Sequence, residues 1–127
     1  MGLEKMRKII VAGSRTITDV PTVSRLITFG LSELLSLEEH NQIEIVSGGA
    51  KGVDKIGELY AVKNYLDLQV FPADWDRYGK KAGYLRNKQM AEYADSLILI
   101  WDGKSRGSQM MLELAKQYKL KIYGKVI

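Results

Sequence analysis

The chain has 127 residues, of which 46% are hydrophobic and 27% are charged, and it contains no cysteine and one histidine, His40. This composition is typical of a globular protein, and we expect residues 1–127 to form a single domain. The lack of cysteine excludes disulfide bonds, thiolate zinc sites and thiol nucleophiles. With only one histidine as well, we expect neither a metal site nor a cofactor.

The net charge of +4 is concentrated in the second part of the chain. Residues 77–127 hold 11 basic and 4 acidic side chains, which is a net charge of +7. Such a surplus favours an anionic partner, either a nucleotide phosphate or a nucleic-acid backbone, although a solvated lysine-rich surface has the same composition. No apolar stretch reaches the roughly 18 residues of a membrane span, and residues 1–8 lack the apolar core of a signal peptide. We therefore expect a cytoplasmic protein without a membrane partner.

Short apolar runs and helical patterns alternate along the chain. The runs predict strands over Lys8–Ala12, Ile43–Ser47, Leu68–Phe71, Ser96–Trp101 and Lys121–Tyr123. The helical patterns cover Val23–Leu35, Val53–Tyr65, Ala82–Tyr93 and Ser108–Tyr118. The alternation predicts an α/β fold, a Rossmann-like and doubly wound, five-stranded, mainly parallel sheet with about four helices. In such sheets, ligands bind beyond the carboxyl ends of the strands, near the point where the strand order reverses.

Glycines follow three of the predicted strands, in each case just before a predicted helix. They are Gly13 after the first strand, Gly48, Gly49 and Gly52 after the second, and Gly103 and Gly107 after the fourth. Glycines at these turns let a backbone approach a ligand closely, and the helix dipole behind them favours an anion. The alternative explanation for each glycine is that the turn requires a positive φ angle, which glycine adopts readily, without any ligand. No dinucleotide fingerprint or Walker motif is present, which disfavours NAD dehydrogenases and P-loop NTPases.

Polar and aromatic side chains on the same loops each have two interpretations. Arg15 offers a fork of donors to a phosphate or forms a surface ion pair with Asp19. Asp54 accepts hydrogen bonds from a ribose hydroxyl or caps its helix. Trp75 stacks on a base or covers the end of the sheet. Arg86, early in the third helix, is expected to point into the cleft.

The loop motifs resemble the YspA-type (cpYpsA-related) family of the SLOG superfamily. The resemblance is carried by Val11–Arg15, Val46–Asp54, Phe71–Trp75, Ala82–Met90 and Gly107–Ser108, which span nearly the whole chain. It implies a Rossmann-like fold that binds a nucleotide or an NAD- or ADP-ribose-derived ligand. The expected ligand-binding residues are Gly13, Ser14, Arg15, Ser47, Gly48, Gly49, Ala50, Gly52, Asp54, Trp75, Arg86, Asn87, Gly103, Gly107 and Ser108.

The stretch that begins at Arg86 is similar to the LOG-type phosphoribohydrolases, which cleave the N-glycosidic bond of nucleoside monophosphates. The resemblance places Arg86 on their catalytic arginine, whereas Met111 stands at the position of their catalytic glutamate. The nearest carboxylate, Glu113, is two residues further and is expected to point about 200° round the helix. Whether the chain is an enzyme stays open, with Arg86, Asp54 and Asp74 as the candidate catalytic residues.

Residues 13–15 and 47–54 are also similar to the loops of the DprA type, which acts on single-stranded DNA. Trp75 and Tyr78 would then be stacking platforms along a basic groove. The first expectation for a partner is therefore a nucleotide or a nucleotide-derived small molecule, and the alternative is a nucleic acid. Because relatives often form dimers, we leave open whether the chain forms a homodimer.

Overall fold

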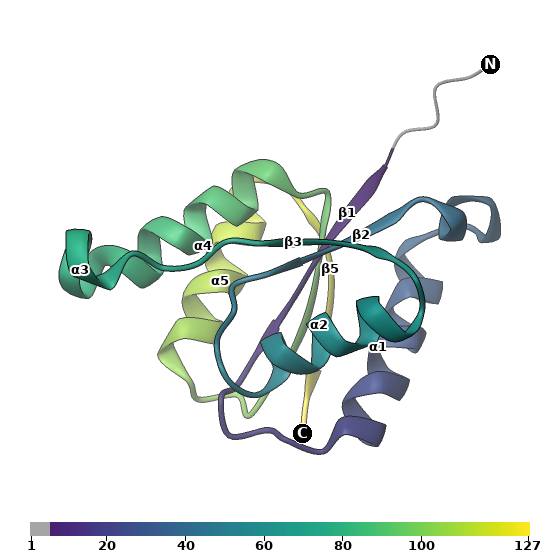
Figure 1. Ribbon diagram of the computed structural model, residues 1–127, viewed down its shortest axis with the longest axis horizontal. Helices are drawn as coiled ribbons and strands as arrows, with labels where there is room; N and C mark the ends of the chain where they lie inside the picture. Colours follow the sequence, from purple (N-terminus) through teal and green to yellow (C-terminus); the bar gives the residue numbers. More distant parts are fainter. Residues whose placement is uncertain (1–5) are drawn as a thin grey trace.

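The computed structural model describes residues 6–127, without the side chains of His40 and Asn41. Within this part of the chain, five parallel strands form a sheet in the order β3-β2-β1-β4-β5 (Figure 1). The strands are β1 (Arg7–Gly13), β2 (Ile43–Ser47), β3 (Asp67–Val70), β4 (Ser96–Trp101) and β5 (Lys121–Val126). The predicted doubly wound α/β fold is confirmed. The expectation that residues 1–8 do not form a signal peptide concerns a segment that lies mostly outside the described residues.

Helices cover both faces of the sheet, as Figure 1 shows. α1 (Val20–Leu34) and α2 (Val53–Lys63) pack on one face, and α4 (Ala82–Tyr93) and α5 (Arg106–Gln117) pack on the other. The start of α1 follows from its sequence, because the side chain of Asp19 accepts a hydrogen bond from the backbone N–H of Thr22 at 3.3 Å. A 3-10 turn, η1 (Leu37–Asn41), connects α1 with β2.

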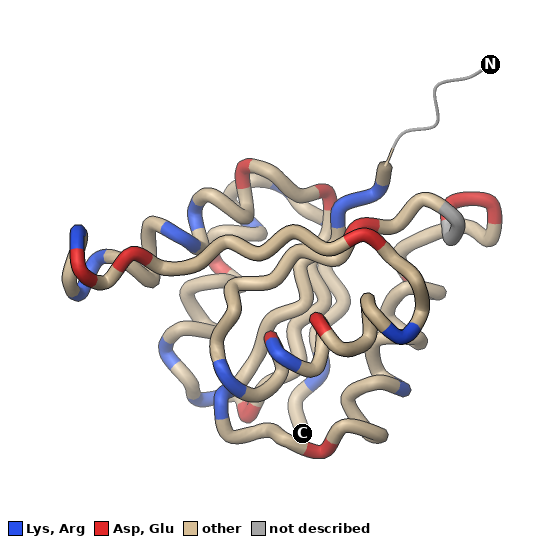
Figure 2. The backbone as a smooth tube through the Cα atoms, in the orientation of Figure 1, with Lys and Arg blue, Asp and Glu red and all other residues tan. Residues whose placement is uncertain are grey.

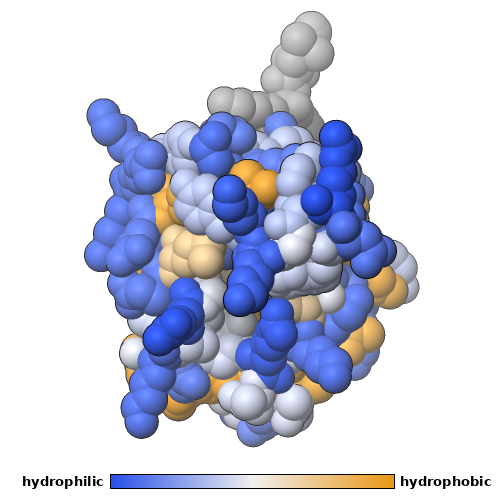
Figure 3. All heavy atoms as spheres, turned by 90° about the vertical axis from the view of Figure 1, so that its left-hand side faces the viewer, coloured by the Kyte–Doolittle hydropathy of each residue, from blue (hydrophilic) through white to orange (hydrophobic). Residues whose placement is uncertain are grey.

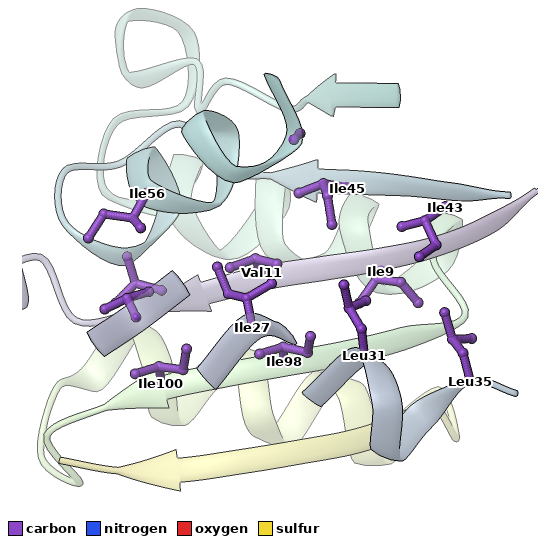
Figure 4. Packing of buried hydrophobic residues seen from close by; sticks show 13 residues of the cluster. Ile9, Val11, Ile27, Leu31, Leu35, Ile43, Ile45, Ile56, Ile98 and Ile100 are labelled. Atoms are coloured by element: carbon purple, nitrogen blue, oxygen red, sulfur yellow. The ribbon is translucent and has the colours of Figure 1, made fainter. Parts of the chain in front are cut away.

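The neighbouring strands β1 and β4 supply apolar side chains to both faces of the sheet. In β1, Ile9 and Val11 join the cluster under α1 and α2, while Ile10 and Ala12 join the cluster under α4 and α5. Figure 4 shows Ile9 and Val11 packed among residues of α1, α2, β2 and β4. Burial of each large aliphatic side chain stabilises the fold by roughly 1.5–3 kcal/mol. Strands that are buried on both faces give the loops at their carboxyl ends a rigid base.

One short helical element lies in the segment that the sequence pattern predicts as a loop. It is α3 (Trp75–Tyr78), followed by a 3-10 turn, η2 (Gly79–Lys81), and it lies at one end of the molecule in Figure 1. The side chain of Asp74 starts α3 by accepting a hydrogen bond from the backbone N–H of Arg77 at 3.1 Å. Four residues are too few to show a helical period, which explains the missed prediction.

The strand order reverses between β1 and β4. From β1 the chain passes to β2 and β3 on one side, and it then returns to β4 and β5 on the other. The chain leaves β1 toward α1 on one face of the sheet, and it leaves β4 toward α5 on the other face. Several Lys and Arg positions lie on the loops at the carboxyl end of the sheet (Figure 2). A ligand site is expected here.

The face that carries α3, α4 and α5 is mainly hydrophilic, with small and scattered apolar areas (Figure 3). Between residues 6 and 127, none of the helices combines the length and the apolar character that a bilayer crossing demands.

Candidate functional site

A pocket of about 280 Å³ lies at the point where the strand order reverses. We call it the switch pocket. It is formed by the carboxyl end of β1, the first turn of α2, the middle of α4 and the start of α5. The predicted ligand residues that line it are Gly13, Ser14, Arg15, Ala50, Asp54, Arg86, Asn87, Gly107 and Ser108. Residues from four separate segments are thus brought together as the fold class predicts.

Hydrogen bonds fix the loop after β1 to the loop after β4. The buried hydroxyl of Ser14 accepts a hydrogen bond from the backbone N–H of Asp102 at 3.0 Å and lies 3.3 Å from the hydroxyl of Ser105. Asp102 in turn accepts from the backbone N–H groups of Lys104 and Ser105, both at 2.8 Å. These backbone hydrogen bonds hold the pKa of Asp102 below its usual value. One wall of the switch pocket is therefore rigid.

The amino-terminal end of α5 faces the switch pocket with Gly107 and Ser108. The residue before the helix, Ser105, makes no side-chain hydrogen bond to the first turn. The first N–H groups of a helix have no acceptor within the helix, and they favour an anion. A Cβ atom at Gly107 would have no heavy atom within 4 Å, so glycine leaves open space at this end of α5.

The side chain of Arg86 crosses the cleft from α4 to the loop after β2. Its Nε donates to the side-chain oxygen of Asn87 at 2.8 Å, and its guanidinium also donates to the backbone carbonyl of Gly48. Burial lowers the pKa of Arg86, the carboxylate of Asp54 raises it, and the positive charge of Arg15 lowers it. Because the two arginines are close enough to influence each other, they form one patch of positive charge.

Asp54 is the buried carboxyl group of the switch pocket, with 5% of its surface exposed. Burial raises its pKa to about 6, while the N–H group of Ala50, the charge of Arg86 and the N–H group of Gly13 act in the opposite direction. The hydrogen bond from Ala50 is 3.2 Å long. A buried carboxyl with this pKa gains or loses a proton near neutral pH, which is a property of many functional sites.

A second pocket, of about 600 Å³, adjoins the switch pocket. We call it the basic pocket, and its walls come from the loop after β2, the start of α2, the end of β3 and α3. Its predicted residues are Arg15, Gly48, Gly49, Ala50, Trp75 and Arg86. Trp75 is 50% exposed, and a Cβ atom at Gly83 would lie 3.3 Å from the edge of its ring. Trp75 is therefore supported by α4 and accessible from the basic pocket.

Four of the predicted residues line neither the switch pocket nor the basic pocket. Ser47 is fully buried, and its hydroxyl accepts from the N–H group of Gly49 at 3.0 Å. Gly52 has φ +78°, and a Cβ atom there would lie 2.3 Å from the carbonyl oxygen of Ser14. Gly103 also has a positive φ angle, and Asp74 caps α3 beside another pocket. The structure gives each of these residues a local structural role.

Six residues of the switch pocket are absent from the predicted ligand-binding residues. They are Ala12, Thr16, Met90, Asp102, Ser105 and Met111. The turn that begins at Asp102 has a signal in the sequence, because an Asp side chain often accepts a hydrogen bond from the backbone N–H two residues on, as Asp102 does from Lys104. Met111 occupies the switch pocket as a buried side chain, whereas Glu113 is exposed and accepts from Gln109 at 3.1 Å on the outside of α5.

No metal-binding group stands out in the described part of the chain. Among residues 6–127, apart from the side chain of His40, no three or more His, Cys, Asp or Glu side chains gather in a way that fits a metal ion.

Comparisons with known proteins agree on the type of fold. The sequence model of the YspA, cpYpsA-related SLOG family matches residues 7–78, which include the loops after β1 and β2. The Gene 61 protein of Mycobacterium phage D29 is 31% identical to the chain, over 88% of this chain and 90% of that protein.

Two solved structures of DNA processing protein A (DprA) have a similar fold. The DprA of Streptococcus pneumoniae has a TM-score of 0.73 and 21% identity over 94% of this chain. The DprA of Helicobacter pylori, which has a unique single-stranded DNA binding mode, has a TM-score of 0.68 and 21% identity over 93% of this chain. The chain spans 50% and 64% of the length of these two proteins. At this identity the likeness concerns the fold alone.

Proposed function

The chain belongs to the YspA, cpYpsA-related SLOG family, and we propose that it binds a nucleotide or a nucleotide-derived small molecule in the switch pocket. The observation that carries the proposal is the convergence on one pocket of the α5 amino-terminal end, Arg15, Arg86 and the buried carboxyl of Asp54. The first three suit a phosphate group, and the carboxyl group suits the hydroxyl groups of a sugar.

The phosphate is bound between α5 and the two arginines. The first N–H groups of α5 supply backbone donors, and the open space at Gly107 lets the phosphate oxygens approach them. Arg86 is held in place by Gly48 and Asn87, so its fork of donors is already oriented. A preorganised donor costs less ordering entropy on binding than a mobile one.

The sugar and the base extend from the phosphate toward Asp54 and Trp75. A carboxylate accepts hydrogen bonds from ribose hydroxyl groups, and Asp54 lies in the same pocket as Arg86. The exposed ring of Trp75 offers a surface for stacking in the adjoining basic pocket. This arrangement favours a nucleotide over inorganic phosphate.

Single-stranded DNA is the second candidate ligand. It is supported by the fold shared with the DprA proteins, one of which has a described single-stranded DNA binding mode, and by the cations around the basic pocket. A strand would place one phosphate in the switch pocket and continue along these cations. The two candidates differ in how their affinity depends on salt.

A thermal-shift screen of mononucleotides, ADP-ribose, cyclic nucleotides and short oligonucleotides tests the proposal. A ligand present at 100 times its dissociation constant stabilises the folded protein by about 2.7 kcal/mol, which is readily measured as a rise in Tm. A small-ligand protein responds to a mononucleotide, and this response changes little with salt. A DNA-binding protein responds only to oligonucleotides, with an affinity that falls by a log–log slope of about −0.7 for each phosphate contacted.

A further inference from the structure

The lining of the basic pocket carries positive charge that its own side chains do not neutralise. Four of its residues are cationic, namely Arg15, Lys51, Lys55 and Arg86, and none of the described residues that line it is acidic. In the switch pocket, by contrast, the two arginines are accompanied by the carboxyl groups of Asp54 and Asp102. The basic pocket therefore offers a place for a further anionic group.

The two pockets adjoin each other. Arg15, Ala50 and Arg86 line both of them. A ligand that occupies both pockets therefore passes these three residues. The combined site is large enough for more than one phosphate group, since the basic pocket alone measures about 600 Å³.

Lys51 and Lys55 keep donors available on this side of the cleft. Lys51 makes no ion pair with any residue that the structure describes. Lys55 contacts Glu58 at 3.4 Å, but its side chain is 58% exposed and an ammonium group has three donors. The other carboxylate oxygen of Glu58 accepts from the hydroxyl of Ser47 at 2.7 Å, which ties Glu58 to the end of β2.

We propose that the ligand carries a second phosphate group, which Lys51 and Lys55 bind in the basic pocket. The site then prefers nucleotides with two phosphate groups over nucleoside monophosphates. The inference rests on the proposed function, because it takes the first phosphate to lie in the switch pocket. The second phosphate has two possible chemical sources: it is linked to the first as a diphosphate, or it is attached to another hydroxyl of the same nucleoside.

Calorimetric titration separates these sources. We would titrate the full chain at about 0.15 M salt with AMP, ADP and adenosine 3′,5′-bisphosphate, and with the same series for the other common bases. At least one bisphosphorylated nucleotide should bind about tenfold more tightly than its monophosphate, which corresponds to one strong charge-assisted contact. Which of the two binds tightly identifies the source of the second phosphate.

The double variant Lys51→Ala/Lys55→Ala tests the assignment of the residues. It should lose the preference for two phosphates and keep its affinity for the monophosphate within about threefold, since exposed lysines contribute weakly at a distance. The matched control is Lys63→Ala/Lys116→Ala, which removes the same charge from exposed positions on α2 and α5 outside both pockets. The control should retain the preference.

Three results would overturn the inference. The first is that monophosphates bind and a second phosphate adds no affinity, which leaves the proposed function intact. The second is a preference that survives in Lys51→Ala/Lys55→Ala. The third is that no mononucleotide binds at all, in which case the proposed function fails too; binding of oligonucleotides alone with a steep salt dependence would then assign the cleft to single-stranded nucleic acid.

Discussion

Arg86 in α4 donates a hydrogen bond to the backbone carbonyl of Gly48, which lies 38 positions earlier in the chain. A Cβ atom at residue 48 would lie 2.7 Å from the Arg86 guanidinium, so only glycine leaves room for this contact. The contact fixes the cation at the boundary between the switch pocket and the basic pocket. Gly48 thus contributes to the site by holding the side chain of Arg86 in place.

Replacement of Arg86 should weaken nucleotide binding with little effect on the fold. A hydrogen bond to a charged group contributes about 1.5–3 kcal/mol, so Arg86→Ala should bind a nucleotide about 10- to 100-fold more weakly. Calorimetric titration gives the affinity, and a thermal melt checks that the variant is folded. Lys116→Ala removes one exposed charge from α5 and serves as the control. Unchanged affinity in Arg86→Ala would remove this residue from the site.

Asp54 should lower the stability of the free protein at neutral pH. Its pKa of about 6 in the folded protein lies above the value of about 3.9 of an unfolded chain. The stabilising contribution of its protonated form is therefore complete below pH ~4 and is lost as the pH rises through about 6. Asp54→Asn, which stays neutral, should be more stable than the wild type by up to about 3 kcal/mol above that window.

Urea unfolding of both proteins at several pH values measures this difference. It should be small near pH 4 and grow as the pH approaches neutrality. Asp54→Asn should also bind a nucleotide less tightly, because it removes a carboxylate acceptor for ribose hydroxyl groups. A stability difference that does not vary with pH would contradict this prediction, because it would show that burial of the charged Asp54 carboxylate does not destabilise the fold.

Gly107 provides a test of the phosphate position. Because a Cβ atom at this residue meets nothing within 4 Å, Gly107→Leu should fold normally, and the loss of a helical glycine should stabilise α5 by about 0.5–1 kcal/mol. The added side chain should nevertheless block the approach of a phosphate to the first N–H groups of α5. A higher Tm together with a lost ligand-induced shift is the expected pair of results. A retained shift would place the phosphate elsewhere.

N-glycosidic cleavage, the alternative activity, can be followed by chromatography of free base after incubation with nucleoside monophosphates. Glu113 is exposed on α5, so Glu113→Gln should leave any release of base unchanged. Because Asp54 and Arg86 line the switch pocket, Asp54→Asn and Arg86→Ala should abolish it. Release that depends on Glu113 would contradict this geometry, and the absence of release assigns the pocket to binding.

The sequence predicts the sheet, and it leads us to expect a site at the carboxyl end of the sheet, because both inferences rest on local patterns. Buried strands such as Ser96–Trp101 are continuous apolar runs, and Asp19 is a local helix signal. Strand alternation then places the loops after β1 and β4 at one end. The fold and the position of these loops can therefore be predicted without knowing which side chains contact one another.

The structural reason for individual glycines could not be predicted from the sequence. A Cβ atom at Gly13 would lie 1.8 Å from the carbonyl oxygen of Ile100, and one at Gly52 would lie 2.3 Å from that of Ser14. A glycine in a sequence indicates that another group lies close to its backbone. It does not tell whether that group is a ligand or a neighbouring loop of the same chain. The position of Lys51 in the lining of the basic pocket could not be predicted either, because it depends on which loops the fold brings together.

The most direct test of nucleotide binding in the switch pocket is an NMR titration of the uniformly ¹⁵N-labelled chain with a nucleotide. Binding in the switch pocket should produce saturable changes that are largest for the amide groups of Ser14, Ala50, Gly107 and Ser108, with smaller changes near Trp75, and with none of these changes in Gly107→Leu. Changes that are centred on the outer face of α1, or the absence of any saturable change with every nucleotide, would contradict it.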